Sequence, residues 1–247
     1  MAKFYPTIVN SFHGSQGERL VYEALSQLSD AYTIFHSFRW IGELDQYRSE
    51  GEADFLILHP EKGILSIEVK AGGISYRDGN WVQRNRNTGQ EKVIDPFGQA
   101  AESQFRIQRY LQKKYFQKIP MIGRAAWFPS VEIKKGLNLP LEVSYDIVLD
   151  INALENTEAY LDKAFTFWQE NLRRPAVSLN RNEVDSLIGL LMPSFDIAET
   201  IASNAEEEQV SYVRLTRQQA AILHYLEEQR EAAIHGLAGT GKSLLAV

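Results

Sequence analysis

Hydrophobic positions early in the chain change from the spacing of a helix to the spacing of a strand. Residues 20–28 carry hydrophobic side chains three or four positions apart, after a capping box that pairs Ser15 with Glu18, and this pattern predicts a helix. Residues 54–59 and 63–70 are two predicted strands joined by a short turn. The first of these strands is hydrophobic on both faces, which is typical of a central strand that is covered on both sides.

The same patterns predict a mixed arrangement of strands and helices in the rest of the chain. Further predicted strands are residues 32–40, 74–77, 80–83, 125–131 and 145–149, and further predicted helices are residues 99–116, 158–171 and 180–192. Strands and helices do not alternate strictly. The pattern therefore favours an α/β (α+β) fold with a central mixed sheet of about five strands flanked by helices.

Composition narrows the class of protein. The 247 residues are 44% hydrophobic and 23% charged, which are values of a folded globular chain. The sequence contains no Cys, so disulfides, thiolate zinc sites and cysteine nucleophiles are excluded. No apolar run is long enough to span a membrane, and the first residues lack the apolar segment of a secretory signal. We expect a cytoplasmic protein without a membrane partner.

Charge is distributed unevenly along the chain. The formal net charge is −6, yet residues 70–135 contain 13 Lys and Arg against 5 Asp and Glu. A basic segment in an acidic protein is typical of a nucleic-acid contact, although a solvated surface gives the same composition. The basic residues that we expect to contact DNA are Arg84, Arg86, Arg106, Arg109 and Lys113.

The two central strands bring carboxylates and a lysine together. Alternation along residues 63–70 places Glu68 and Lys70 on one face, and a short antiparallel turn puts Asp54 beside one of them. A register shift of one residue would move Asp54 to the opposite face. Two carboxylates about 5 Å apart repel each other by roughly 3 kcal/mol at an effective dielectric constant near 20. A divalent cation, Lys70 or both must offset this repulsion, and oxygen ligands suit Mg²⁺ or Mn²⁺.

This spacing resembles a known nuclease pattern. Asp54, thirteen further residues and then Glu68-Val69-Lys70 resemble the PD-(D/E)xK nuclease core. With Gly17-Glu18, the segment also resembles the nuclease-related domain, NERD, over about residues 10–135. The resemblance implies a restriction-endonuclease-like fold and metal-dependent phosphodiester cleavage. Asp54, Glu68 and the Val69 carbonyl would hold the metal, while Lys70 would orient or help deprotonate the attacking water.

Three further residues have alternative interpretations. The family pattern implies that Glu18 reaches the metal, whereas the capping box would turn Glu18 back to the Ser15 backbone N–H. Gln99 and Gln104 resemble glutamines that many such nucleases place near the site, although an exposed polar helix face is the favoured explanation. The residues His13, His36 and His59 show no metal-ligand spacing, so we expect them to have surface or packing roles.

A phosphate-binding pattern lies near the end of the sequence. Residues 236–243 fit G-x-x-x-x-G-K-[ST], after a short predicted strand and before the apolar start of a helix. Backbone N–H groups of such a loop wrap phosphates, and its lysine and serine reach the β/γ-phosphates and Mg²⁺. A glycine-rich turn with an incidental lysine is the alternative. The expected nucleotide-binding residues are Gly236, Gly239, Thr240, Gly241, Lys242 and Ser243.

Upstream of this loop, residues 215–219 resemble the adenine-reading motif of superfamily-one DNA helicases. Gln219 would contact adenine, although Thr216 and Gln219 also fit a capping box. The resemblance implies ATP as a cofactor of the full-length protein and the remainder of a helicase motor as its partner. A Walker B acid and an arginine finger are missing, so we expect no appreciable ATP hydrolysis by this chain. The predicted division is a nuclease-like domain at 1–193, an acidic linker at 194–212 and an incomplete P-loop domain at 213–247.

Three functions follow from these features. The leading hypothesis is the metal-dependent DNA nuclease module of a nuclease–helicase fusion. The alternatives are a non-catalytic DNA-binding adaptor for the motor and an ATP-binding helicase fragment. The sequence leaves strandedness, polarity of cleavage and oligomeric state open.

Overall fold

The computed structural model describes residues 1–7, 16–44, 47–115, 117–134, 136–172 and 177–194. Residues 1–193 form one compact unit. The predicted acidic linker, glutamine motif and P-loop, apart from residue 194, lie outside the described residues, as do Ser15 and His13.

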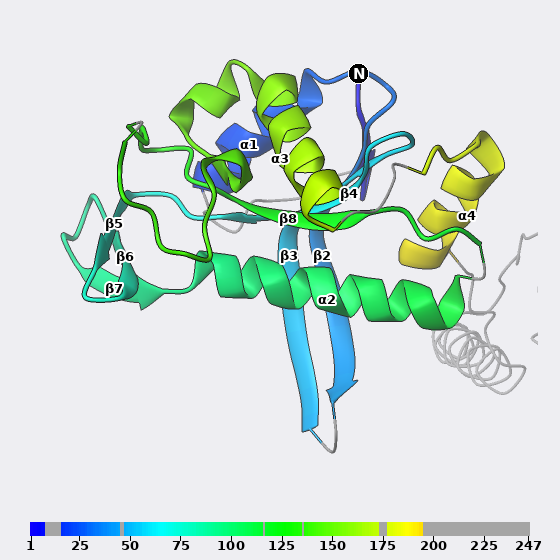
Figure 1. The fold of residues 1–247 in the computed structure, drawn as a ribbon, viewed down its shortest axis with the longest axis horizontal. Helices are drawn as coiled ribbons and strands as arrows, with labels where there is room; N and C mark the ends of the chain where they lie inside the picture. The colour runs from blue at the N-terminus through cyan, green and yellow to red at the C-terminus, as the bar shows by residue number, and fades with distance from the viewer. Residues whose placement is uncertain (8–15, 45–46, 116, 135, 173–176, 195–247) are drawn as a thin grey trace, which may run out of the picture. The chain divides into compact units, whose positions relative to one another are not determined.

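Nine strands, four α-helices and two 3₁₀ turns make up the described part of the chain (Figure 1). The strands are β1 (Lys3–Tyr5), β2 (Thr33–Leu44), β3 (Tyr47–His59), β4 (Gly63–Val69), β5 (Gly73–Arg77), β6 (Asn80–Arg84), β7 (Glu91–Ile94), β8 (Ile122–Trp127) and β9 (Val148–Leu149). The helices are α1 (Gln16–Ser26), α2 (Pro96–Lys114), α3 (Thr157–Asn171) and α4 (Arg181–Leu191), with 3₁₀ turns at Tyr145–Ile147 and Ile151–Leu154. None of the helices within these ranges has the length and apolar character needed to cross a membrane.

Six strands form the main sheet in the order β1-β2-β3-β4-β8-β9. The β2–β3 and β3–β4 pairs are antiparallel, while β1–β2, β4–β8 and β8–β9 are parallel. The predicted mixed sheet and its flanking helices are confirmed, with six strands where about five were expected. Helices α1 and α3 pack on one face, and α2 and α4 pack on the other (Figure 1).

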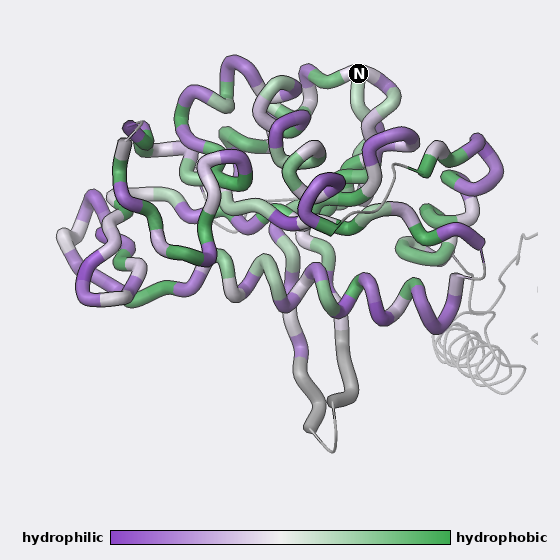
Figure 2. The backbone as a smooth tube through the Cα atoms, in the orientation of Figure 1, coloured by the Kyte–Doolittle hydropathy of each residue, from purple (hydrophilic) through white to green (hydrophobic). Residues whose placement is uncertain are grey.

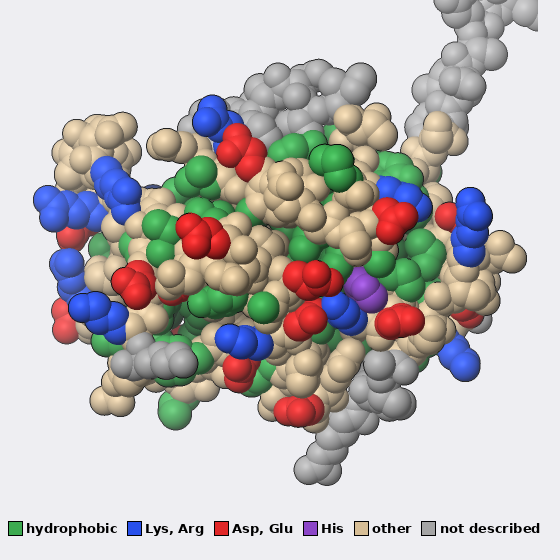
Figure 3. Space-filling model, turned by 90° about the horizontal axis from the view of Figure 1, so that it is seen from above, with side chains coloured by type: hydrophobic (Ala, Val, Ile, Leu, Met, Phe, Trp, Pro, Cys, Tyr) green, Lys and Arg blue, Asp and Glu red, His purple; other side chains and the backbone are tan. Residues whose placement is uncertain are grey.

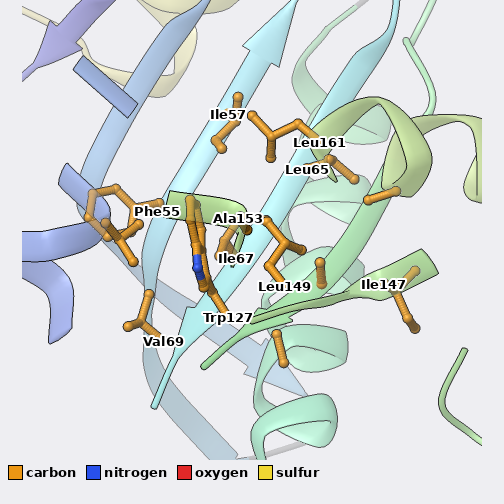
Figure 4. Packing of buried hydrophobic residues seen from close by; sticks show 14 of the residues in the cluster. Phe55, Ile57, Leu65, Ile67, Val69, Trp127, Ile147, Leu149, Ala153 and Leu161 are labelled. Atoms are coloured by element: carbon orange, nitrogen blue, oxygen red, sulfur yellow. The ribbon is translucent and has the colours of Figure 1, made fainter. Parts of the chain in front are cut away.

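The two hydrophobic cores follow from the alternation of side chains along β3 and β4. Phe55 and Ile57 in β3, with Leu65 and Ile67 in β4, belong to the core beneath α1 and α3 (Figure 4). Leu56, with the neighbouring even-numbered positions, packs against α2 and α4 in the second core. Figure 2 shows hydrophobic residues concentrated where the helices face the sheet. The prediction that β3 is central and covered on both sides is therefore confirmed.

The hairpin of β2 and β3 is longer than predicted. Its far half pairs only within itself and extends beyond the rest of the sheet (Figure 1). A second, separate sheet contains β5, β6 and β7, of which the predicted hairpin supplied only the first two. The third strand was missed because Glu91 and Lys92 are exposed and give it no hydrophobic pattern.

Several element boundaries differ from the predictions. Helix α2 begins at Pro96, three residues earlier than expected, because Asp95 caps it by accepting the Gly98 N–H at 2.9 Å and proline is tolerated in the first turn. The predicted strand 125–131 is β8 at residues 122–127, where its ladder with β4 lies. The predicted strand 145–149 is a 3₁₀ turn followed by the two residues of β9.

Candidate active site

The candidate site lies where β3 and β4 stop pairing. Phe55 faces Ile67 in the last pair of the ladder, and a continued ladder would place Asp54 opposite Glu68. Instead, the Val69 backbone N–H donates a hydrogen bond to Asp54 Oδ2 at 2.6 Å. The Asp54 carboxylate thus takes the place of a main-chain acceptor at the point where the strands part. The predicted proximity of Asp54 to the end of β4 is confirmed.

Lys70 and Glu68 form an ion pair at the same place. The Lys70 ammonium donates a hydrogen bond to Glu68 Oε1. The Glu68 residue is only 4% exposed, and the Lys70 side chain is 18% exposed. A carboxylate buried to this degree needs a charged or hydrogen-bonding partner, which Lys70 supplies. The ammonium is thereby held beside the buried Glu68 carboxylate.

Burial and mutual repulsion both disfavour the charged forms of the carboxylates at the site. Burial, and after it the charge of the nearby Glu68 carboxylate, raises the pKa of Asp54 to about 7. The Val69 N–H and Lys70 act in the opposite direction. Burial also raises the pKa of Glu68, against the attraction of Lys70, and the charges of Glu18 and Glu52 add to the increase. The site therefore disfavours the charged forms of Asp54 and Glu68, with Lys70 as the ion-pair partner of Glu68.

Glu18 belongs to this cluster by its electrostatic effect. It lies in the first turn of α1, and its negative charge contributes to the raised pKa values of both Asp54 and Glu68. Glu18 Oε2 also lies 3.5 Å from His36 Nε2. His36 is buried against Phe55, in agreement with the predicted packing role, but its contact with Glu18 was not foreseen. Glu18 of α1 and His36 of β2, which are remote in sequence, thus lie in contact.

The donor chemistry at the site suits a hard divalent cation. Within the described ranges, no group of three or more His, Cys, Asp or Glu side chains is placed to hold a metal ion. Asp54 and Glu68 would therefore need the Val69 carbonyl and water to complete a coordination shell. Mg²⁺ characteristically binds through one or two carboxylates and keeps several waters. The carboxylate excess and the all-oxygen donor set fit such an ion.

The comparison with family models covers this part of the chain. Residues 13–129 match the nuclease-related domain family, NERD. The matched segment contains Glu18, Asp54, Glu68 and Lys70. The match suggests that this segment has a nuclease-related function, which is a hydrolase activity. No curated protein and no solved structure gives a significant match.

The basic residues predicted to contact DNA lie in the matched segment and form two groups. Arg106, Arg109 and Lys113 line a groove along α2. Arg84 and Arg86 lie at the end that carries β5–β7, where Lys and Arg side chains gather among acidic ones (Figure 3). The Arg86 guanidinium donates a hydrogen bond to the Ser130 carbonyl, so part of its role is to hold the loop after β6.

The sequence analysis did not predict two residues of the groove, and it left the role of Gln99 undecided. Arg39 and Trp40 in β2 lie beside the α2 cations, because the long β2–β3 hairpin passes alongside α2. The adjacent cation and aromatic ring were the available signal, but nothing local in the sequence places β2 next to α2. Gln99 is exposed in the first turn of α2.

Proposed function

We propose that the nuclease-related domain is a metal-dependent phosphodiesterase that cleaves DNA. The observation that carries the proposal is the convergence of Asp54, Glu68 and Lys70 where β3 and β4 part, with the Val69 N–H on Asp54. Such a buried carboxylate pair beside one ammonium is costly as a purely structural feature, because both pKa values are raised. The site gains its charge balance when a divalent cation binds.

In this proposal, Asp54, Glu68 and the Val69 carbonyl hold Mg²⁺ or Mn²⁺. The cation supplies stabilisation of charge on the scissile phosphate and a lower pKa for water in its shell. The Lys70 ammonium, held by Glu68, orients the attacking water by hydrogen bonding and offsets charge on a non-bridging phosphate oxygen. Glu18 adds a further negative charge to the same cluster.

The wider protein is proposed to be a nuclease–helicase fusion. Support comes from the P-loop pattern with Lys242 and from Gln219, which lie outside the described residues. ATP would then be a cofactor of the full-length protein, and the remaining motor its partner. Binding of a fluorescent ATP analogue, compared between the native chain and Lys242→Ala, tests this part separately.

The direct test of the nuclease proposal is DNA cleavage at fixed salt. We expect product from single- or double-stranded oligonucleotides in millimolar Mg²⁺ or Mn²⁺ and none in excess EDTA, because hard-cation sites release their ion to the chelator. DNA binding without cleavage under both conditions would contradict the proposal and favour the adaptor function. Titrating the binding against salt measures the contribution of phosphate contacts in either case.

A further inference from the structure

The groove along α2 combines positive charge with aromatic and aliphatic side chains. Its volume is about 380 Å³, and it lies between β2, α2 and the end of α4. The residues that line it are Phe38, Arg39, Trp40, Arg106, Ile107, Arg109, Tyr110, Lys113, Leu190, Leu191 and Pro193. Four of these side chains are cationic and none of them is acidic. A polyanion that also offers flat apolar surfaces has the complementary chemistry.

The Trp40 ring is fixed at one side of the groove. It lies directly over Gly51 in the paired strand, where an added Cβ would come within 2.1 Å of the ring. Its Nε1–H donates to Ser103 Oγ at 3.4 Å, and the Arg106 guanidinium lies 5.2 Å from the ring centroid. The glycine therefore makes room for the indole, which in turn supports the guanidinium. Guanidinium planes and aromatic rings are the surfaces on which unpaired bases stack.

Tyr110 offers a second stacking surface. It is 42% exposed, and its hydroxyl donates to the Leu190 carbonyl at 3.2 Å, which anchors the ring between α2 and α4. Arg106, Arg109 and Lys113 lie three and four residues apart on α2, so their positive charges follow one side of the helix over about 10 Å. Neighbouring turns of α2 thus offer contacts for both the bases and the phosphates of one strand.

The groove is connected to the candidate active site through β3. Ser103 Oγ donates to the Glu52 carbonyl at 3.4 Å, and the Glu52 carboxylate pairs with Arg39 at 3.2 Å. Glu52 lies two residues before Asp54 on the same strand, a distance of about 7 Å along it. The same hydrogen-bonded residues that position Trp40 therefore border the carboxylate cluster. A strand bound in the groove would lead toward that cluster.

We propose that this groove binds a single-stranded segment of the polynucleotide substrate, with unpaired bases against Tyr110 and Arg106 and phosphates on Arg109 and Lys113. The inference rests on the proposed nuclease function and specifies its substrate. A duplex keeps its base faces stacked inside and would use only the cations. The aromatic and aliphatic lining therefore favours a single strand.

The test is binding of a fluorescent oligodeoxynucleotide to the full chain in EDTA, which separates binding from cleavage. We expect the single strand to bind more tightly than the duplex of the same sequence. Tyr110→Ala should weaken single-strand binding about tenfold, as expected for loss of base stacking, while Tyr110→Phe retains it. Phe105→Ala is the matched control, because Phe105 is an exposed aromatic residue of α2 that does not line the groove.

The contribution of the groove cations is tested by the salt dependence of binding in variants of two adjacent lysines. Lys113→Ala should reduce the slope of log affinity against log salt by about 1, whereas Lys114→Ala, exposed on the same helix outside the groove, should change it less.

Equal binding of duplex and single strand, with Tyr110→Ala matching Phe105→Ala, would overturn the inference. If the groove variants cleave DNA and bind single strands as the native chain does, the groove proposal is wrong and the nuclease proposal is unaffected. If single-strand binding depends on the groove but the native chain cleaves no DNA, the nuclease proposal is wrong and the groove proposal is unaffected.

Discussion

Replacement of Lys70 by methionine is expected to reduce metal-dependent DNA cleavage by about 10² to 10³-fold, the usual cost of losing a group that stabilises charge in a transition state. Methionine preserves most of the side-chain volume and removes the ammonium that Glu68 holds. Asp54→Ala is expected to abolish detectable cleavage, because it removes a proposed metal ligand and the acceptor of the Val69 N–H. Initial rates at saturating DNA and Mg²⁺ measure both effects.

The matched control for this prediction is Lys62→Met. Lys62 is also a partly buried lysine in an ion pair, with Asp162 at 2.5 Å, but it belongs to the turn at the other end of the β3–β4 hairpin. Loss of its ammonium is expected to cost stability and leave the cleavage rate of the folded protein within a factor of a few. Equal rates for the native chain and the Lys70→Met variant would mean that Lys70 has only a structural role.

Asp54→Asn is expected to make the metal-free protein more stable at pH 8. The pKa of Asp54 is about 7 in the folded chain and 3.8 as its ordinary value, so the folded state holds the proton more tightly. The contribution of this group to stability is full below about pH 4 and is lost as the pH rises through about 7. At pH 8, native Asp54 costs the fold on the order of 2 to 4 kcal/mol, which asparagine avoids while still accepting from Val69.

Thermal unfolding in EDTA at pH 5 and pH 8 measures this effect. At pH 8, Tm of Asp54→Asn should exceed that of the native chain by roughly 5 to 15 °C, and the difference should shrink toward pH 5. Asp78→Asn is the control, since Asp78 lies in the exposed turn between β5 and β6 and no such gain is expected there. A variant less stable than the native chain at pH 8 would show that the Asp54 carboxylate is not destabilised in the fold.

The sequence was sufficient to predict the central hairpin and the meeting of its functional groups. A short turn makes the two strands antiparallel, and a strand that is hydrophobic on both faces is typical of a central strand, so Asp54 was expected beside Glu68 or Lys70. The pattern left a register shift of one residue open, and the structure excludes it. These are local consequences of residues 54–70. The helices were predicted for the same reason, because each has its own hydrophobic periodicity and, in α4, its own capping box.

The features that the sequence did not predict depend on packing between elements that are distant in the chain. The bond from Val69 to Asp54 exists because β3 pairs with β2 alone before Phe55, and its ladder with β4 begins only at Phe55. The groove depends on that same hairpin reaching α2, where Trp40 contacts Ser103, a residue 63 positions later. Pattern reasoning assigns each element a face and says little about which distant element will meet it. The DNA-binding prediction therefore found the α2 cations and missed their aromatic partners in β2.

The most direct measurement of the central claim is Mn²⁺ binding to the full chain in the absence of DNA, followed by electron paramagnetic resonance of the free ion. We expect a saturable site in the native chain at near-neutral pH. Affinity should fall at least tenfold in Asp54→Asn and in Glu68→Gln, since each loses one of the two anionic ligands, and should remain unchanged in Asp78→Asn. Failure of the native chain to bind Mn²⁺, or equal binding by all four proteins, would contradict the assignment of this carboxylate cluster as a metal site.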